Sequence, residues 1–414
     1  MDNEQTLIPD LFRTEYKKIV AVLCRLFGIG QIEIAEDIAG ETFIAASEVW
    51  SLKGLPDNPT AWLYAVAKNK ARDYFKHQAV FVKNVVPGLR GEIKTIDVEI
   101  DLSVKNISDS QLAMIFAVCN PVNSEEAQIG LALNILCGFG VEEIAGAFLT
   151  NRDVIYKRLQ RAKEKLKTQQ IRIEPPSVHE IDNRLETVLR TLYLLFNEGY
   201  HSTSQDRTVR TEFCFEAMQL TKLLLESQLT NTPVVNGLFS LMCFQASRLA
   251  ARTDEKGEMI LYNDQDASLW DQTLIAKGTQ HLDQAMKGDR LSKYQLEAAI
   301  AFWHTSKDDT HEKWENILQL YNMLLMVEYS PVIALNRTYA LSKANGKEEA
   351  IVEGEKIELK GNPFYHSLMG NIYTDVDNSK AIEQYRIALT LAPSNSMKQT
   401  IDRNIARLER DEHK

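Results

Sequence analysis

Basic side chains gather on one predicted helix near the middle of the chain. Residues 151–170 include seven basic and two acidic residues, whereas the whole chain of 414 residues has a net charge of −10. Lysine and arginine contact DNA phosphates, and arginine also donates hydrogen bonds to base edges. The segment 141–167 (VEEIAGAFLTNRDVIYKRLQRAKEKLK) is predicted to form a short helix, a tight turn and this basic helix, which together can enter a DNA major groove. A surface helix with solvated lysines is the alternative interpretation.

A capping box and an apolar stripe should position this basic helix. Thr150 and Asp153 have the spacing in which each side chain accepts a hydrogen bond from the other residue's amide. The buried face is predicted from four residues at helical spacing, which are Ile155, Leu159, Ala162 and Leu166.

A second segment interleaves aromatic and basic residues. In residues 58–77 (NPTAWLYAVAKNKARDYFKH), four aromatic residues alternate with Lys68, Lys70, Arg72 and Lys76. Unpaired bases of an opened strand stack on aromatic rings, and cations follow the backbone. Asn69 offers an amide to a base edge. The alternative is that Trp62 and its apolar neighbours are core residues and that the lysines coat the outside.

Acidic residues mark a third helix, predicted over residues 34–50. Glu33, Asp37 and Glu41 follow one another at i, i+4 and i+8, so their carboxylates share one face. Such a face fits a basic partner, although a solvated acidic face is the alternative. The opposite face carries an apolar stripe that is predicted to point inward and includes Ile38, Phe43, Ala46 and Trp50.

Composition excludes several classes of protein. The 44% apolar and 25% charged residues are ordinary for a globular protein, and the acidic balance excludes a uniformly basic DNA-coating protein. Five scattered cysteines without a CxxC pair indicate buried thiols in a reducing cytosol. No signal peptide or run of about 18 apolar residues occurs, so a cytoplasmic protein without a membrane partner is expected. The eight histidines lack ligand spacing, so we expect no enzyme, metal or cofactor.

Nearly every periodic segment predicts helix, which makes the expected fold all-α. The helices expected in the first half cover residues 11–27, 34–50 and 60–78, and they resume at residue 109. Those expected in the second half cover residues 181–197, 208–228, 234–251, 268–286, 293–305, 314–327 and 331–344, followed by a helix pair in residues 364–393. In that last pair, small and aromatic positions such as Gly370 and Tyr385 are typical of a tetratricopeptide repeat. A helical-hairpin array is therefore expected, with a compact α-bundle as the alternative.

Breaks in the periodicity predict the domain organisation. Residues 81–108 contain glycines and a proline and are predicted to form a linker. Pro175-Pro176 predicts a domain boundary. The expected divisions are a helical bundle over residues 1–80, the linker, a helix-turn-helix domain over residues 109–170 and a helical extension over residues 178–414.

Taken in order, three segments resemble the extracytoplasmic-function sigma factors of bacterial RNA polymerase. Residues 35–50 (AEDIAGETFIAASEVW) and 58–77 resemble their region 2, and residues 125–166 (EEAQIGLALNILCGFGVEEIAGAFLTNRDVIYKRLQRAKEKL) resemble their region 4. Residues 189–220 (LRTLYLLFNEGYHSTSQDRTVRTEFCFEAMQL) and 330–341 (SPVIALNRTYAL) resemble the subgroup with a tetratricopeptide-like C-terminal extension. Gly40 and Asn120 depart from the residues that are usual in this family.

The resemblance implies partners and contact residues. Core RNA polymerase would be bound through its largest-subunit clamp and its flap region, and a protein or small-molecule regulator could bind the extension. The polymerase-binding residues would be Glu36, Asp37, Glu41, Thr42 and Phe43. The loop at residues 52–59 would capture a base of the promoter −10 element, with further contacts from Trp62, Lys68, Asn69, Arg72 and Lys76. The −35 element would be read by Arg152, Asp153, Tyr156, Lys157, Arg158 and Arg161.

The resemblance implies a promoter-specificity factor that binds core polymerase and helps to open DNA. Two alternatives belong to other classes of protein. One is a helical-repeat interaction protein whose N-terminal helices no longer engage polymerase. The other is a helix-turn-helix regulator that binds duplex DNA without polymerase.

Overall fold

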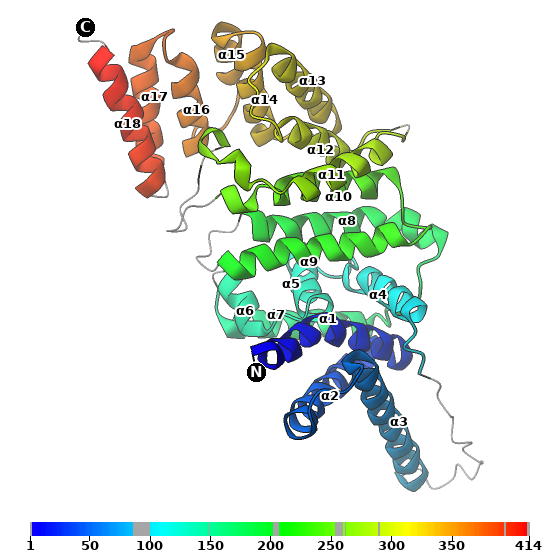
Figure 1. Cartoon of the computed structure of the whole chain (residues 1–414). Helices are drawn as coiled ribbons and strands as arrows, with labels where there is room; N and C mark the ends of the chain where they lie inside the picture. Colours follow the sequence, from blue (N-terminus) through cyan, green and yellow to red (C-terminus); the bar gives the residue numbers. More distant parts are fainter. Residues whose placement is uncertain are drawn as a thin grey trace. The chain divides into compact units, whose positions relative to one another are not determined.

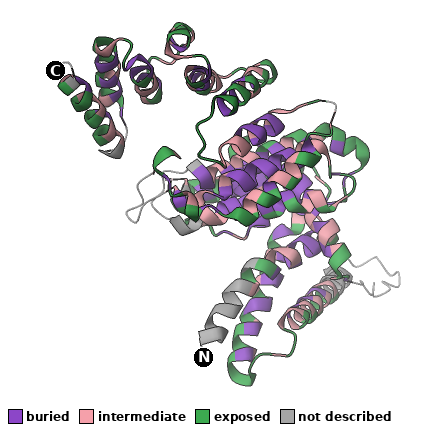
Figure 2. Ribbon diagram, turned by 45° about the horizontal axis from the view of Figure 1, so that its top comes forward, coloured by how far each residue is buried: buried purple, intermediate pink, exposed green. Residues whose placement is uncertain are grey.

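The computed structural model describes residues 2–85, 100–148, 150–201, 207–252, 260, 262–288, 290–392 and 395–411. All regular elements in these residues are helical, with no strand among them, so the expected all-α fold is confirmed. Two compact units form, Met1–Asn231 and Thr232–Lys414 (Figure 1). Within each unit the buried residues lie on the faces where helices meet (Figure 2).

The first unit contains nine α-helices among the described residues. They are α1 (Asp2–Phe27), α2 (Ile32–Lys53), α3 (Pro59–Val85), α4 (Val104–Val118), α5 (Glu125–Leu131), α6 (Val141–Ala147), α7 (Arg152–Thr168), α8 (Val178–His201) and α9 (Arg207–Glu226). A 3₁₀ turn, η1 (Ile29–Gln31), precedes α2, and a π-helical segment, η2 (Ala132–Leu136), follows α5.

Helix α1 is the central helix of the N-terminal part, and it packs against α2 and α4. Its Ile19 and Leu23 are fully buried, and α2 presents three fully buried alanines, Ala35, Ala39 and Ala46. Small residues let two helix backbones approach closely. The first three helices were predicted in the right places. Helix α1 begins earlier than predicted and ends at Phe27 as predicted, whereas α2 and α3 extend beyond both predicted ends.

The predicted linker at residues 81–108 is partly wrong. Helix α3 continues to Val85 and α4 begins at Val104, whereas residues 86–99 lie outside the described residues. Ser103 caps α4 because its side chain accepts a hydrogen bond from the Asn106 amide. Asp101 in turn accepts from the Ser103 amide at 2.8 Å. This local polar capping begins a helix inside a segment whose composition resembled a linker.

The predicted Thr150–Asp153 capping box is also wrong, although the turn lies where it was expected. Asn151 is the N-cap of α7, and its side-chain Oδ1 accepts from the Asp153 amide at 2.7 Å. An asparagine oxygen reaches the second helical amide and caps the helix as well as a threonine does. The four residues predicted to form the apolar face of this helix are all buried.

The first compact unit does not end at Pro175-Pro176. Helices α8 and α9, which were expected to begin the extension, pack within it. Thr191 of α8 donates from its hydroxyl to Gln128 Oε1 of α5 at 2.8 Å. Phe213 of α9 contacts Phe139 with ring centroids 4.7 Å apart. The prolines interrupt the backbone, but the core continues past them because these apolar faces need a partner.

The second unit contains helices only, among the residues that are described. They are α10 (Pro233–Ala246), α11 (Gln272–Ala285), α12 (Lys293–Trp303), α13 (His311–Val327), α14 (Pro331–Ala344), α15 (Lys347–Gly354), α16 (Pro363–Tyr373), α17 (Asn378–Leu391) and α18 (Asn395–Asp411). Three 3₁₀ turns lie between α10 and α11, at Leu249–Ala251, Tyr262–Asp264 and Ala267–Leu269.

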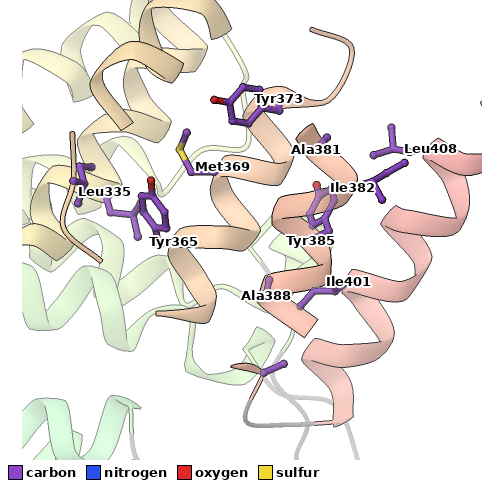
Figure 3. Packing of buried hydrophobic residues seen from close by; sticks show 12 residues of the cluster. Leu335, Tyr365, Met369, Tyr373, Ala381, Ile382, Tyr385, Ala388, Ile401 and Leu408 are labelled. Carbon is purple, nitrogen blue, oxygen red and sulfur yellow. The ribbon is translucent and has the colours of Figure 1, made fainter. Parts of the chain in front are cut away.

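Glycines allow close helix packing in the second unit. A Cβ on Gly370 would lie 2.8 Å from Tyr385 Cδ1, so α16 meets the Tyr385 ring of α17 without room for a side chain. Tyr385 is fully buried and lies between α16 and α18, whose Ile401 and Leu408 complete the cluster (Figure 3).

One helical stretch, Pro233–Ala251, is long and apolar enough to cross a membrane. However, 72% of its most apolar window is buried inside the structure, as in the core helix of a soluble protein. The five cysteines are buried free thiols, in agreement with the prediction.

Replacing Gly40 by alanine should stabilise the first unit by about 1 kcal/mol. Gly40 lies inside α2, and an added Cβ would meet no atom within 4 Å. Urea unfolding followed by far-UV circular dichroism measures the change.

Gly28→Ala is the matched control. A Cβ at Gly28 would also meet no atom within 4 Å, but the backbone there has φ 85° and ψ 161°. That conformation costs other residues about 1–3 kcal/mol, so this variant should be destabilised. A Gly40→Ala variant no more stable than the natural chain would contradict the expectation.

Candidate polymerase and DNA interface

The acidic face of α2 is exposed. Glu33, Asp37 and Glu41 all lie on the solvent side of the helix, as their spacing predicted. Glu41 also pairs with Lys70 of α3, whose Nζ lies 2.7 Å from Glu41 Oε2. An exposed pair of this kind contributes little to stability and can open for a partner. Two carboxylates of this face, Glu33 and Asp37, are thus presented for an intermolecular contact.

Glu36 has a different environment from its neighbours. It is half-buried, and both of its carboxylate oxygens accept from Lys163 Nζ of α7, at 3.0 and 2.9 Å. Lys167 of α7 packs nearby, since an added Cβ on Gly30 would lie 3.5 Å from its Cγ. A residue expected to contact polymerase is therefore engaged by the helix expected to read DNA.

Thr42 and Phe43 are buried and so are not placed to contact a partner directly. The Thr42 hydroxyl donates to the Ile38 carbonyl at 2.7 Å, and the Phe43 ring lies 5.1 Å from the Phe12 ring. The apolar stripe predicted that Phe43 points into the core, whereas the family resemblance implied that it contacts polymerase. Its burial agrees with the first prediction. Both side chains can support the helix that presents Asp37 and Glu41.

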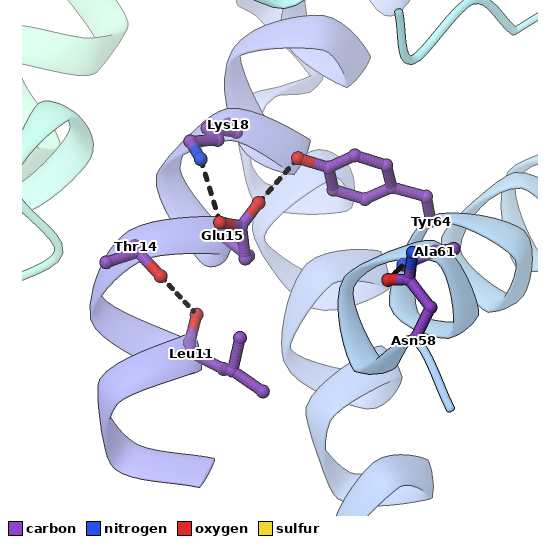
Figure 4. A network of polar contacts seen from close by, with 7 residues as sticks. All are labelled: Leu11, Thr14, Glu15, Lys18, Asn58, Ala61 and Tyr64. Atoms are coloured by element: carbon purple, nitrogen blue, oxygen red, sulfur yellow. Dashed lines mark hydrogen bonds and ion pairs between the residues drawn. The ribbon is translucent and has the colours of Figure 1, made fainter. Parts of the chain in front are cut away.

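A buried carboxylate fixes the start of α3 relative to α1. Glu15 of α1 accepts from the Tyr64 hydroxyl at 2.5 Å and from Lys18 Nζ at 2.8 Å (Figure 4). Asn58 begins the helix, because its Oδ1 accepts from the Ala61 amide at 2.9 Å (Figure 4). Glu15 could not be identified from the sequence, because its only signal was a charged residue beside an apolar stripe.

The residues expected to contact the −10 element differ in exposure along α3. Trp62 is half-buried against Trp50, with ring centroids 5.3 Å apart, so it has both a packing role and a free surface. Lys68 and Arg72 are partly exposed, whereas Asn69 and Lys76 are exposed. The loop expected at residues 52–59 begins later than predicted, because α2 continues to Lys53 and is capped by Gly54, whose φ is 80°. Leu52, in the last turn of α2, is 86% exposed, so an apolar side chain lies free beside the loop expected to capture a base.

Helix α7 presents its basic face to solvent. Of the six residues expected to read the −35 element, five are exposed and Arg158 is half-exposed. Asn123 holds the helix to the preceding segment, because its amide donates to the Ala162 carbonyl at 3.3 Å. A cavity of about 390 Å³ lies alongside α7, and its polar lining includes Asn123, Ser124, Lys157, Arg158, Arg161 and Lys165. The cavity is strongly cationic and fits an anionic group such as a DNA phosphate.

Comparisons with known proteins find relatives of the whole chain and of two of its parts. Residues 11–80 match the family model for sigma-70 region 2, and residues 184–286 match a family of unknown function, DUF6596. The Rhizobium meliloti (strain 1021) protein "Uncharacterized protein R00370" is 33% identical over 371 residues, which cover 88% of this chain and 88% of that protein. No solved structure matches the chain. The chain therefore belongs to one family with the R. meliloti protein, and its sigma-70 region 2 indicates a sigma-factor-like role in RNA polymerase binding and transcription initiation.

Proposed function

We propose that the chain is a promoter-specificity factor of the extracytoplasmic-function kind, which binds core RNA polymerase and reads the −10 and −35 elements. The observation that carries the proposal is the sigma-70 region 2 match at residues 11–80, which contains both the exposed acidic face of α2 and the aromatic-basic helix α3. The acidic face would bind the clamp of the largest polymerase subunit. Helix α3 and the loop at residues 52–59 would hold the opened −10 strand.

In this proposal α6 and α7 form a helix-turn-helix that reads the −35 element. The exposed cations of α7 and the cationic cavity beside it support the assignment. The chain is acidic overall, so polymerase would have to tether both DNA-binding surfaces at a high effective concentration.

Run-off transcription with purified core polymerase tests the proposal. The full chain should direct transcripts from a subset of promoter fragments of its own genome, and core polymerase alone should not. A chain that stimulates no genomic promoter would contradict it, whereas a pull-down that captures other proteins and no polymerase subunit would favour the helical-repeat interaction protein.

We further propose that the C-terminal extension regulates this activity by holding the promoter-reading parts together. Lys17 of α1 pairs with Glu216 of α9 at 2.5 Å, and both side chains are largely buried. Arg184 of α8 donates to the Phe116 carbonyl of α4 and lies over the Phe116 ring. Helices α8 and α9 fall largely within residues 184–286, which match the family of unknown function. These two helices contact both α1, in the part that matches sigma-70 region 2, and α4.

Glu216→Lys should increase run-off transcription about fivefold or more when core polymerase is limiting. Reversing one charge of a largely buried pair places two like charges together, and a cost of even about 1–2 kcal/mol is a factor of about 5–30 in an equilibrium. The cost would favour an arrangement in which α9 has moved away from α1 and no longer restrains region 2. The double variant Lys17→Glu, Glu216→Lys restores opposite charges and is the matched control. It should return transcription to the natural level. A single variant with unchanged transcription, or a double variant as active as the single one, would contradict this role of the pair.

A further inference from the structure

A cavity in the second unit lies outside all of the surfaces considered above. It has a volume of about 330 Å³ and is lined by residues of α13, α14 and α16 and by His304, which directly follows α12. This volume is in the range of cavities that hold small organic molecules. Ligand sites in proteins are typically cavities of this kind, with aromatic walls and a few polar groups.

The lining of this cavity carries no formal charge. Its polar members are His304, Trp314, Tyr321, Asn336 and Tyr339, and the remainder are aliphatic residues and Phe364. Burial, together with the nearby cations Arg248 and Lys313, lowers the pKa of His304 to about 3, so the imidazole is neutral near pH 7. Burial also raises the pKa of the Tyr321 hydroxyl, which stays protonated. A charged ligand would lose its hydration here and find no opposite charge in the wall.

Two cations beside the aromatic wall are already engaged. Lys343 Nζ pairs with Asp309 at 2.8 Å, and Lys313 Nζ donates to the Ser306 carbonyl at 2.5 Å. Both ammonium groups also lie over the Trp314 ring, 5.6 and 5.8 Å from its centroid. They therefore hold the aromatic wall in place from outside the cavity lining.

The aromatic wall is rigid and arranged edge to face. The Trp314 and Tyr339 rings have centroids 5.4 Å apart at an interplanar angle of 88°, and His304 lies 5.9 Å from Trp314 at 67°. Trp314 is further fixed because its indole N–H donates to Asp309 Oδ1. A further planar ring can continue this pattern, since aromatic pairs favour edge-to-face and offset contacts. Rings that are already fixed lose little conformational freedom on binding.

Polar atoms of the wall favour a ligand that can form hydrogen bonds. The Nδ1 atom of His304 is buried and has no hydrogen-bond partner among the described residues. Because solvent does not reach this atom, it is not available to a ligand in the cavity as the wall is arranged. Asn336 is exposed at the cavity and offers an amide that both donates and accepts.

We propose that this cavity binds an uncharged planar aromatic ring that carries an N–H or O–H group. The ring could belong to a free small molecule or to the side chain of a peptide, because both present the same chemistry to the wall. The proposal does not depend on the proposed role in transcription, since no surface assigned to polymerase or DNA takes part in it.

Ligand-observed NMR titrations of the full chain test the proposal, with indole as the probe for a free molecule and N-acetyl-tryptophanamide as the probe for a peptide side chain. At least one of the two should bind saturably with a dissociation constant below about 1 mM. Tighter binding of indole identifies a small molecule as the occupant, and tighter binding of the amide identifies a peptide side chain. Indole-3-acetate, which adds a negative charge, should bind at least about fivefold more weakly than indole.

Two exposed positions provide variants that leave the core intact. Phe364, which is 61% exposed, and Asn336 are replaced separately by alanine, and each change should raise the dissociation constant of the tighter probe at least about fivefold. Tyr329→Ala is the matched control, since Tyr329 is a 71% exposed aromatic residue outside the cavity lining, and its removal should leave binding unchanged. The proposal is overturned if neither probe binds saturably, or if indole-3-acetate binds as tightly as indole. It is also overturned if the Phe364→Ala and Asn336→Ala variants bind the tighter probe with the same dissociation constant as the natural chain.

Discussion

Asp37→Lys is expected to weaken binding of the chain to core RNA polymerase by at least about 100-fold, which corresponds to about 3 kcal/mol. Asp37 is exposed in the middle of α2, between Glu33 and Glu41 on the face proposed to meet the basic polymerase clamp. A lysine there removes one favourable charge and places a like charge against the partner, a change that typically costs several kcal/mol. Fluorescence anisotropy with labelled chain and purified core polymerase measures the loss.

The matched control is Asp283→Lys, which makes the same substitution at an exposed aspartate in α11 of the second unit. It changes the net charge equally, so it separates a local contact from a general electrostatic effect. Binding should stay within about twofold of the natural chain. If the two variants bound polymerase equally well, the acidic face of α2 would not be the docking surface.

The buried and exposed faces of a helix could be predicted from the sequence, because they depend only on the spacing of apolar and charged residues along that helix. The buried stripe of α7 and the exposed carboxylates Glu33 and Asp37 both follow from the helical period, and no other part of the chain is needed to infer them. The same period predicted that Phe43 points inward. Family resemblance assigned it a contact role instead, and the structure buries it.

Pairings between distant segments could not be predicted in this way. Glu36 and Lys163 are 127 positions apart, and nothing in the local pattern of either helix distinguishes them from their charged neighbours. Glu15 is similar, because it is buried by packing against α3 and its Tyr64 partner lies 49 positions away. Such pairs depend on how helices meet, which the spacing of residues along one helix does not determine.

The end of the first compact unit was missed for a related physical reason. Pro175-Pro176 breaks the helical hydrogen bonding, and such a break is visible in a single sequence. Whether the chain then starts a new core depends on the apolar faces on either side. Leu192 and Phe196 of α8 are fully buried within the first unit, so the core crosses the break. A proline pair therefore predicts where helical hydrogen bonding ends better than it predicts where one hydrophobic core ends.

Replacing Arg158 and Arg161 together by alanine is expected to lower transcription from a promoter with an intact −35 element by at least about 30-fold, while binding to core polymerase stays unchanged. Both side chains line the cationic cavity beside α7, and each arginine that contacts a base or phosphate contributes about 1–3 kcal/mol. Neither residue belongs to the buried stripe that holds the helix in place.

Run-off transcription on paired templates measures the effect, one with its −35 element intact and one with that element scrambled. The natural chain should favour the intact template, and the double variant should transcribe both at a similar low rate, because it no longer reads the element. The salt dependence gives a second readout, since each lost phosphate contact lowers the slope of log binding constant against log salt by about 0.9. Arg403→Ala, at an exposed arginine of α18, removes one positive charge and should leave both templates unaffected. A double variant that kept its preference for the intact template would exclude α7 as the −35 reader, even if it still bound polymerase.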